Sequence, residues 1–262
     1  MIIAQISDTH VLERDEQHFV DNNASLASIV ASLNSEDPRP DLVLATGDLT
    51  NWGHPGQYEM LAEILADLNL PVLPLIGNHD VRALTREMFP DVPWADTQHA
   101  SWVSSRPDLT IIGLDSTDPD NHGAVFDEAR NEWLRTCLAS ASGPVILTLH
   151  HPPFATGVEW MDSSGFVGLP ELREVIAEHS TQIARILCGH FHRPVVTTVE
   201  GVTASICPAG TYHVGLDLRP GAGKSIIRDP RGYQLHMIDG PTVVTHTRYV
   251  DTGEASFDPG WD

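Results

Sequence analysis

Short apolar runs of strand length, rich in β-branched residues, recur from residue 2 to residue 187 and constrain the fold more than any other feature. They occupy residues 2–6, 42–45, 72–76, 110–114, 145–149 and 183–187. Between them, apolar residues recur at helical spacing in 25–33 and 58–68, and two further helices are expected around 133–138 and over 170–179. Strands that alternate with helices form βαβ units, so this α/β pattern predicts a largely parallel sheet with helices on its faces.

The pattern changes after residue 188, where strand-like runs follow one another with only short turns between them. These runs lie at 195–199, 202–206, 233–238 and 243–250. Turns such as Glu200-Gly201 and Asp239-Gly240 are typical of antiparallel hairpins. We therefore expect two packed sheets with helices outside. No repeat or Gly/Ser linker divides the chain, which predicts a single domain over residues 1–250 and an acidic tail at 251–262.

Charge and hydropathy exclude two classes of partner, nucleic-acid polymers and membranes. The chain has 36 acidic and 15 basic residues, for a formal net charge of -21, and Lys224 is its only lysine. Proteins that bind nucleic-acid polymers depend on Lys and Arg to neutralise phosphates, so we expect no such polymer here. No apolar run approaches the ~18 residues of a membrane span, and no signal peptide is expected, so we expect no membrane partner.

The cysteines indicate the compartment. Cys137, Cys188 and Cys207 are odd in number and lie far apart in the sequence. This spacing fits neither a disulfide framework nor a thiolate metal site. We therefore expect a reducing, cytoplasmic location, with an intermolecular disulfide as the alternative.

Polar side chains follow five of the apolar runs, at the point where each expected strand ends. These blocks are Ser-Asp-Thr-His at 7–10, Thr-Gly-Asp at 46–48, Gly-Asn-His-Asp at 77–80, His-His-Pro-Pro at 150–153 and Cys-Gly-His-Phe-His at 188–192. The carboxyl ends of parallel strands meet at one crevice, so we expect these side chains to converge there. The candidate metal ligands among them are Asp8, His10, Asp48, Asn78, His150, His190 and His192.

These candidates offer carboxylate and amide oxygens and imidazole nitrogens, a set that suits Zn, Mn, Fe or Co. Seven ligands are too many for one tetrahedral ion but suit two. A bridging carboxylate would hold two ions about 3.5–4 Å apart, the arrangement that clamps the attacking and leaving oxygens in a displacement at phosphorus. Asp48, which follows an early central strand, is the natural bridge, together with a water or hydroxide.

The five blocks, in this order, resemble the calcineurin-like metallophosphoesterase superfamily over residues 8 to 192. Within it, the Asn-His-Asp block and His-His-Pro-Pro resemble the class III cyclic-nucleotide phosphodiesterase and glycerophosphodiesterase branch. The resemblance implies a four-layer αββα sandwich, with two mixed sheets flanked by helices. It also implies two ligand sets that share one residue: Asp8, His10, Asp48 and His192 for one ion, and Asp48, Asn78, His150 and His190 for the other.

The resemblance implies a separate task for His79, which would contact the phosphate beside Asn78 and donate a proton to the leaving alkoxide. General acid catalysis by a positioned histidine contributes roughly 10²–10⁴-fold to a rate. We expect Asp80 to orient this histidine through a hydrogen bond. His213 is a further candidate substrate contact, because it follows the stretch at 208–211 that returns to the pocket in relatives.

Three other histidines and one glycine-rich stretch are expected to lie outside the metal ligands and catalytic groups. His151 is expected to pack outside the metal ligands, and His54 and His122 are expected on surface loops. The stretch 221–225 ends like a phosphate-binding Walker loop, but position 218 holds leucine where that loop requires glycine. We expect 221–225 to be a loop near the mouth of the site.

Together these features predict an enzyme that uses two metal ions to hydrolyse small-molecule phosphodiesters, of the 3',5'-cyclic nucleotide or glycerophosphodiester type, by attack of a metal-activated hydroxide. The stretch 47–53 reads Gly-Asp-Leu-Thr-Asn-Trp-Gly and lacks the Asp-Arg pair of protein phosphatases, which disfavours phosphoprotein substrates. The alternatives are a phosphomonoesterase or nucleotide pyrophosphatase of the same fold, and a non-catalytic binding scaffold. Relatives form dimers or larger oligomers, so the resemblance allows a homodimer or a higher homo-oligomer.

Overall fold

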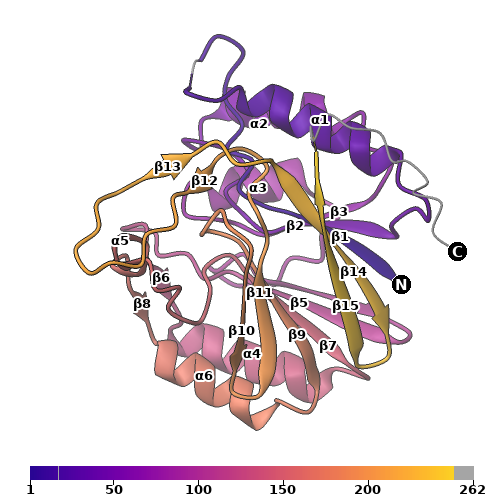
Figure 1. Ribbon diagram of the computed structural model, residues 1–262. Helices are drawn as coiled ribbons and strands as arrows, with labels where there is room; N and C mark the ends of the chain where they lie inside the picture. Colours follow the sequence, from indigo (N-terminus) through magenta and orange to yellow (C-terminus); the bar gives the residue numbers. More distant parts are fainter. Residues whose placement is uncertain (17, 251–262) are drawn as a thin grey trace, which may run out of the picture.

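A computed structural model of the chain describes residues 1–16 and 18–250, in which two sheets are stacked between two layers of helices (Figure 1). The first sheet contains, in spatial order, β15 (Thr242–Tyr249), β14 (Gly232–Asp239), β1 (Ile2–Ile6), β2 (Leu42–Ala45) and β3 (Val72–Pro74). β1, β2 and β3 are parallel, whereas β14 and β15 are antiparallel to their neighbours. The acidic tail expected at 251–262 lies outside the described residues.

The second sheet is also mixed. Its order is β10 (Val195–Val199), β11 (Val202–Ile206), β9 (Ile183–Cys188), β7 (Val145–Leu149), β5 (Leu109–Leu114) and β4 (Trp102–Arg106). The four inner strands are parallel, and β10 and β4 pair antiparallel at the two edges. The expected α/β architecture of two mixed sheets flanked by helices is therefore confirmed.

The helices divide between the two outer faces. α1 (Asn22–Asn34), α2 (Pro55–Leu65) and α3 (Arg82–Met88) lie on the side of the first sheet, whereas α4 (Glu128–Ser140) and α6 (Leu169–Glu178) cover the second sheet (Figure 1). The short helix α5 (Glu159–Asp162) and the two-stranded pairs β6 (Ala124–Val125) with β8 (Phe166–Val167) and β12 (His213–Val214) with β13 (Ile226–Ile227) stand apart from both sheets. Among the described residues, no helix is long and apolar enough to cross a membrane.

Alternation along the strands explains why the sheets stack. On β2, Leu42 and Leu44 pack into the cluster between the two sheets, while Val43 and Ala45 pack against the helices. β7 follows the same rule, because Ile146 faces the first sheet and its neighbours face α4 and α6. Successive strand residues point to opposite faces, so a wholly apolar strand is stable only when both faces are covered.

The expected elements fall where the sequence pattern places them, but their ends differ. The helix expected at 58–68 begins earlier, at Pro55, where proline fits the first turn, and ends at Leu65. α3 had no apolar signal, because Thr85 is its one buried residue among those described. β4 was also missed, since only Trp102 of this edge strand is fully buried. The Trp102 indole donates to the carbonyl of Pro74 at 2.7 Å and so joins the two sheets.

Candidate metal centre

The ends of five strands meet at one place, and all the blocks named from the sequence lie there. Asp8 and His10 follow β1, Asp48 follows β2, Asn78 follows β3, His150 follows β7, and His190 and His192 follow β9. Backbone bonds hold these loops together: Asp8 N–H donates to Gly47 O at 3.0 Å, and Gly189 N–H donates to His150 O at 3.0 Å. Both sheets therefore contribute side chains to one crevice, as expected for parallel strand ends.

Four of these side chains form a compact buried group. Asp8, His10, Asp48 and His192 each offer one oxygen or nitrogen atom, and these atoms all lie within 4.8 Å of one another. His192 Nε2 is 3.3 Å from Asp8 Oδ1, and His10 Nε2 is 3.1 Å from His192 Nε2. Two carboxylates and two imidazoles pointing at a common centre can hold a divalent metal ion. This group is the first of the two sets expected from the sequence.

Asp48 connects this group to the second set. Its Oδ2 atom lies 3.6 Å from His10 Nε2 and 3.4 Å from His150 Nε2, so histidines of the two sets approach the same oxygen. The ring centroids of His150 and His190 are 5.2 Å apart. Asn78 lines the same crevice. The structure thus brings together the residues expected for both ions.

Unpartnered polar atoms indicate that something further belongs in this crevice. His150 Nε2 and Asn78 Oδ1 are buried without a hydrogen-bond partner among the described residues. Buried polar atoms normally have partners, and leaving one without a partner costs about 1–3 kcal/mol. The His150 nitrogen, once its proton is displaced, and the Asn78 amide oxygen fit a cation of the Zn, Mn, Fe or Co type. The residues present therefore fit bound metal.

The backbone at the site is strained. Among the described residues, six that are not glycine have positive φ, and five of them are Asp8 (53°), His10 (43°), Asp48 (50°), His190 (70°) and His192 (58°). A residue with a Cβ atom pays roughly 1–2 kcal/mol for the left-handed region. Such strain clusters at functional sites, where the surrounding structure enforces it.

Glycine allows the loops to pack closely around this strained backbone. A Cβ atom at Gly77 would lie 2.1 Å from Asp48 Oδ1, and a Cβ atom at Gly189 would lie 2.1 Å from Ser7 Oγ. Neither position has room for a side chain. The glycine before each ligand candidate thus serves close approach, as expected from the sequence.

Burial and neighbouring charges shift the pKa values of the site's ionisable groups in different directions. Burial opposes ionisation of Asp48, but His150 and His79 outweigh it and hold the pKa of Asp48 well below its usual range. Burial acts to lower the pKa of His150, yet Asp48 prevails and raises that pKa to about 9. Burial raises the pKa of Asp8 and lowers the pKa of His190 to about 3. The neutral His190 ring keeps a nitrogen lone pair for a ligand bond.

His79 is oriented by a residue that was not expected. Its backbone N–H donates to Asp48 Oδ1 at 2.9 Å, and its ring Nδ1 lies 2.6 Å from the carbonyl oxygen of Asn51. A carbonyl oxygen only accepts, so Nδ1 carries a hydrogen and Nε2 is left for other contacts. The expected orientation by Asp80 is wrong, because that carboxylate accepts from the backbone N–H groups of Gly77, Leu49 and Thr50.

His151 lies close to the second set. Its Nδ1 atom is 2.9 Å from Ser116 Oγ and its Nε2 atom is 3.3 Å from His122 O, but one of its nitrogens also lies within 4.8 Å of ring nitrogens of His150 and His190. The expected place of His151 outside the metal ligands stays a prediction. His213 lies on β12 and is buried between Tyr212 and Val214, which line the crevice. Tyr212 and Val214 are in the cavity lining and His213 is not, so the expected contact between His213 and substrate stays a prediction.

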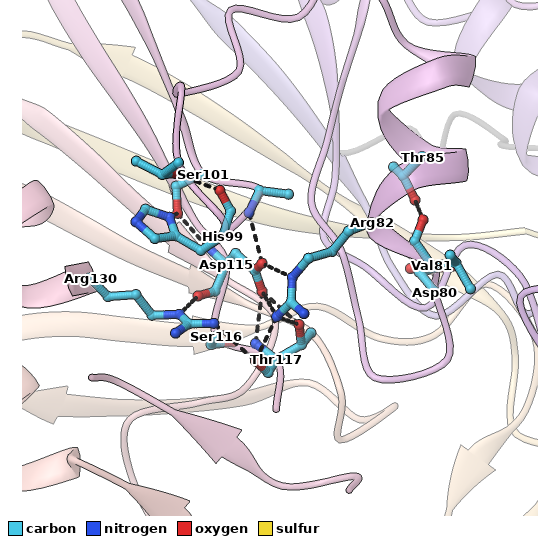
Figure 2. A network of polar contacts seen from close by, with 12 residues as sticks. Asp80, Val81, Arg82, Thr85, His99, Ser101, Asp115, Ser116, Thr117 and Arg130 are labelled. Atoms are coloured by element: carbon cyan, nitrogen blue, oxygen red, sulfur yellow. Dashed lines mark hydrogen bonds and ion pairs between the residues drawn. The ribbon is translucent and has the colours of Figure 1, made fainter. Parts of the chain in front are cut away.

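A buried polar network supports the loop that carries Asn78 and His79 (Figure 2). Arg82 Nε donates to Asp115 Oδ2 at 2.6 Å, and its guanidinium also donates to Thr117. Arg130 Nε donates to the Asp115 carbonyl at 2.7 Å. Burial acts to raise the pKa of Asp115, but the Arg82 guanidinium prevails and lowers it. This ion pair ties α3 to the end of β5, a sixth strand end that the sequence reasoning did not use.

The crevice opens into a cavity of about 430 Å³. Its lining includes several side chains that no motif identified: Trp52, His122, Trp160, Tyr212 and Lys224. His122 is exposed, as expected, but it also lines the cavity, where its Nδ1 atom lies 2.9 Å from Asn78 Nδ2. The stretch at 221–225 does border the site, since Lys224 belongs to the wall. These residues come from loops, where single-sequence patterns carry the weakest signal.

A comparison with protein families identifies this architecture. The model of the calcineurin-like phosphoesterases matches residues 1–194, most of the chain. The chain belongs to this family. The predicted resemblance and fold are thereby confirmed, and this phosphoesterase carries a buried cluster of histidine and aspartate able to bind metal ions.

Individual relatives extend the match over nearly the whole chain. A probable glycerophosphodiester phosphodiesterase of Arcobacter nitrofigilis is 30% identical over 263 residues, covering 98% of this chain and 96% of its own. A cAMP/cGMP dual specificity phosphodiesterase of Mycobacterium tuberculosis is also 30% identical, covering 97% and 80%. The purple acid phosphatase of yellow lupin shares the fold, with a TM-score of 0.68 at 14% identity over 98% of this chain and about half (52%) of that protein.

Metal binding should stabilise this phosphoesterase, because the cluster is buried and rich in unpartnered atoms. After bound metal is removed by chelation, adding Mn²⁺ at 100 times its Kd should stabilise the fold by about 2.7 kcal/mol. This corresponds to a rise in Tm of roughly 5–10 °C for a chain of this size. Calorimetry with and without Mn²⁺ measures the shift.

Asp48→Asn should lose most of this shift, whereas Asp91→Asn, at an exposed carboxylate, should keep it. An Asp48→Asn protein that gains as much stability from Mn²⁺ as the unmodified chain would contradict the assignment of the site.

Proposed function

We propose that this phosphoesterase hydrolyses small-molecule phosphodiesters at a binuclear metal centre. The observation that carries the proposal is the position of Asp48 Oδ2, within 3.6 Å of His10 and 3.4 Å of His150, where two ligand sets share one carboxylate. Relatives that match most of the chain are named glycerophosphodiester and cyclic nucleotide phosphodiesterases, which supports a diester substrate. We take 3',5'-cyclic nucleotides and glycerophosphodiesters as the two substrate classes.

Two divalent ions, of Fe, Mn, Zn or Co, would be held by the two sets, with Asp48 as the shared ligand. The first set is Asp8, His10, Asp48 and His192, which cluster in the structure. The second set, taken from the family resemblance, is Asp48, Asn78, His150 and His190, in which His150 lies 3.4 Å from Asp48. When bound, such ions supply a water of lowered pKa and neutralise the charge of the phosphoryl oxygens. Both sets are buried apart from His190 and Asn78, which lie half-buried at the crevice wall.

The chain's own residues supply the remaining chemistry. His79 lines the cavity, and the Asn51 carbonyl holds its ring by Nδ1, so a charged ring carries its transferable proton on Nε2. We assign this proton to the leaving alkoxide. The Nδ2 atom of Asn78, 2.9 Å from the His122 ring, orients the amide so that Oδ1 faces the crevice. Half-buried Trp160 and Tyr212 line the cavity and restrict the entry of water.

The free thiols and the family resemblance suggest a cellular compartment and an oligomeric state. Cys137, Cys188 and Cys207 are all free, which supports a reducing compartment, and we propose the cytoplasm. A homodimer or a higher homo-oligomer is the assembly we propose.

The diester proposal predicts a substrate profile. Loaded with Mn²⁺, the enzyme should turn over bis-p-nitrophenyl phosphate and cyclic AMP faster than p-nitrophenyl phosphate. Asn78→Ala should lower kcat at least tenfold without unfolding the chain, because the side chain is at the crevice wall and outside the core. Asn69→Ala, at an exposed asparagine in the loop between α2 and β3, is the matched control.

Steady-state rates and circular dichroism of the three proteins give the answer. Turnover of the monoester alone would indicate the phosphomonoesterase alternative. Absence of both bound metal and activity after loading would indicate a binding scaffold, and a fully active Asn78→Ala enzyme would contradict the second metal position.

The role of His79 predicts a dependence on the leaving group. His79→Gln should slow diesters with alkoxide leaving groups by about 10²–10⁴-fold, since a poor leaving group needs the proton. Diesters that release p-nitrophenolate should be slowed much less. Rates measured over a series of leaving groups, with His246→Gln as a control at an exposed histidine of β15, test this role. Equal losses for both kinds of leaving group would contradict proton donation.

A further inference from the structure

The only lysine of the sequence lies in the wall of the catalytic cavity. Lys224 belongs to the segment between β12 and β13, and its Nζ atom is 5.8 Å from the ring centroid of Trp160. Both residues line the cavity, on elements separated by more than sixty positions in the sequence. Lys224 is the sole lysine or arginine among the described residues that line it. Basic residues are scarce in this chain of net charge -21, so the place of its one lysine is a clue to how the cavity works.

Lys224 has no acidic partner, although acidic groups are close along the chain. Among the described residues it makes no hydrogen bond or ion pair. Asp217, in the same segment, pairs with Arg219. Glu159, beside Trp160, accepts from the backbone N–H of Gly221 at 2.7 Å. The nearby carboxylates thus have other partners, and the positive charge of Lys224 is left for what enters the cavity.

The segment that carries Lys224 is anchored at several points. Gly215 N–H donates to Ser225 O at 2.8 Å, directly after Lys224. Arg193 Nη1 donates to Val214 O at 3.0 Å and pairs with Asp229 at 3.1 Å, which joins the base of the hairpin to the loop after His192. Lys224 is therefore held in place by the loop that follows His192, a candidate metal ligand.

We propose that Lys224 determines which phosphodiesters the site accepts, by favouring an anionic group and disfavouring a cationic group on the alcohol that stays with phosphorus. This inference rests on the proposed phosphodiesterase function. A tryptophan face attracts a quaternary ammonium group such as choline through a cation–π interaction. Here Lys224 already lies over that face of Trp160, and two like charges repel. The site is thus selective against choline and ethanolamine as the retained alcohol.

A series of diesters that differ only in charge tests this inference. Each releases p-nitrophenolate, and the retained alcohol is glycolate (anionic), ethanol (neutral) or choline (cationic). For the Mn²⁺-loaded enzyme, kcat/KM should fall in the order glycolate, ethanol, choline. Lys224→Gln should reduce the glycolate-to-choline ratio about tenfold, the effect of one exposed charge a few ångströms from the substrate.

Two further variants separate charge from packing. Lys224→Arg should keep the order, because it keeps the charge, and Lys224→Glu should reverse it. Arg228→Gln removes a positive charge just after β13, outside the cavity lining, from a side chain that donates to the Phe19 carbonyl, and should leave the ratio unchanged. The preference of the unmodified enzyme should also shrink in 0.5 M NaCl, because salt screens an exposed charge.

The outcomes distinguish this inference from the function on which it rests. If the unmodified enzyme hydrolyses the series and Lys224→Gln keeps the same ratio, the role of Lys224 is overturned and the phosphodiesterase proposal stands. If the metal-loaded enzyme hydrolyses none of the three diesters, the phosphodiesterase proposal fails and the role of Lys224 fails with it.

Discussion

The structure depends on one buried carboxylate, that of Asp48. Its Oδ1 atom accepts the His79 backbone N–H at 2.9 Å, while Oδ2 faces His10 and His150 at 3.6 and 3.4 Å. A buried charge is costly unless opposite charges and hydrogen bonds compensate it. Burial raises the pKa of Asp8 and lowers the pKa of His190 to about 3, so the protein supplies little positive charge beside its two buried carboxylates. Bound cations would supply the missing positive charge, and they would do so where a phosphodiester could be held.

The arrangement of the two sheets brings their strand ends together around that carboxylate. Gln5, fully buried on β1, donates from Nε2 to Thr46 Oγ1 at 3.0 Å and to Cys188 O at 2.9 Å, which links the sheets just behind the site. The Arg82–Asp115 pair links α3, which directly follows the Asn78 loop, to the end of β5 in the second sheet. Anchoring from both sides explains how the site tolerates left-handed backbone at the ligand candidates, because surrounding bonds offset the strain.

Much of this could be predicted from the sequence, for a physical reason. The strands are buried on both faces, so runs such as 42–45 are wholly apolar and easily recognised, and polar residues directly after them must lie at the carboxyl edge of the sheet. Elements without such a signal were missed: α3 buries one described residue, and β4 lies at an edge. The roles of Asp80, His122 and Lys224 depend on how loops from distant parts of the chain pack, which no local pattern records.

Anomalous diffraction from crystals of the Mn²⁺-loaded protein, recorded on both sides of the manganese absorption edge, measures directly whether two metal ions share Asp48. We expect two peaks about 3.5–4 Å apart. One should lie among Asp8, His10 and His192, the other beside Asn78, His150 and His190, and both should contact Asp48. A single peak, or a second peak away from the Asp48 carboxylate, would contradict this sharing.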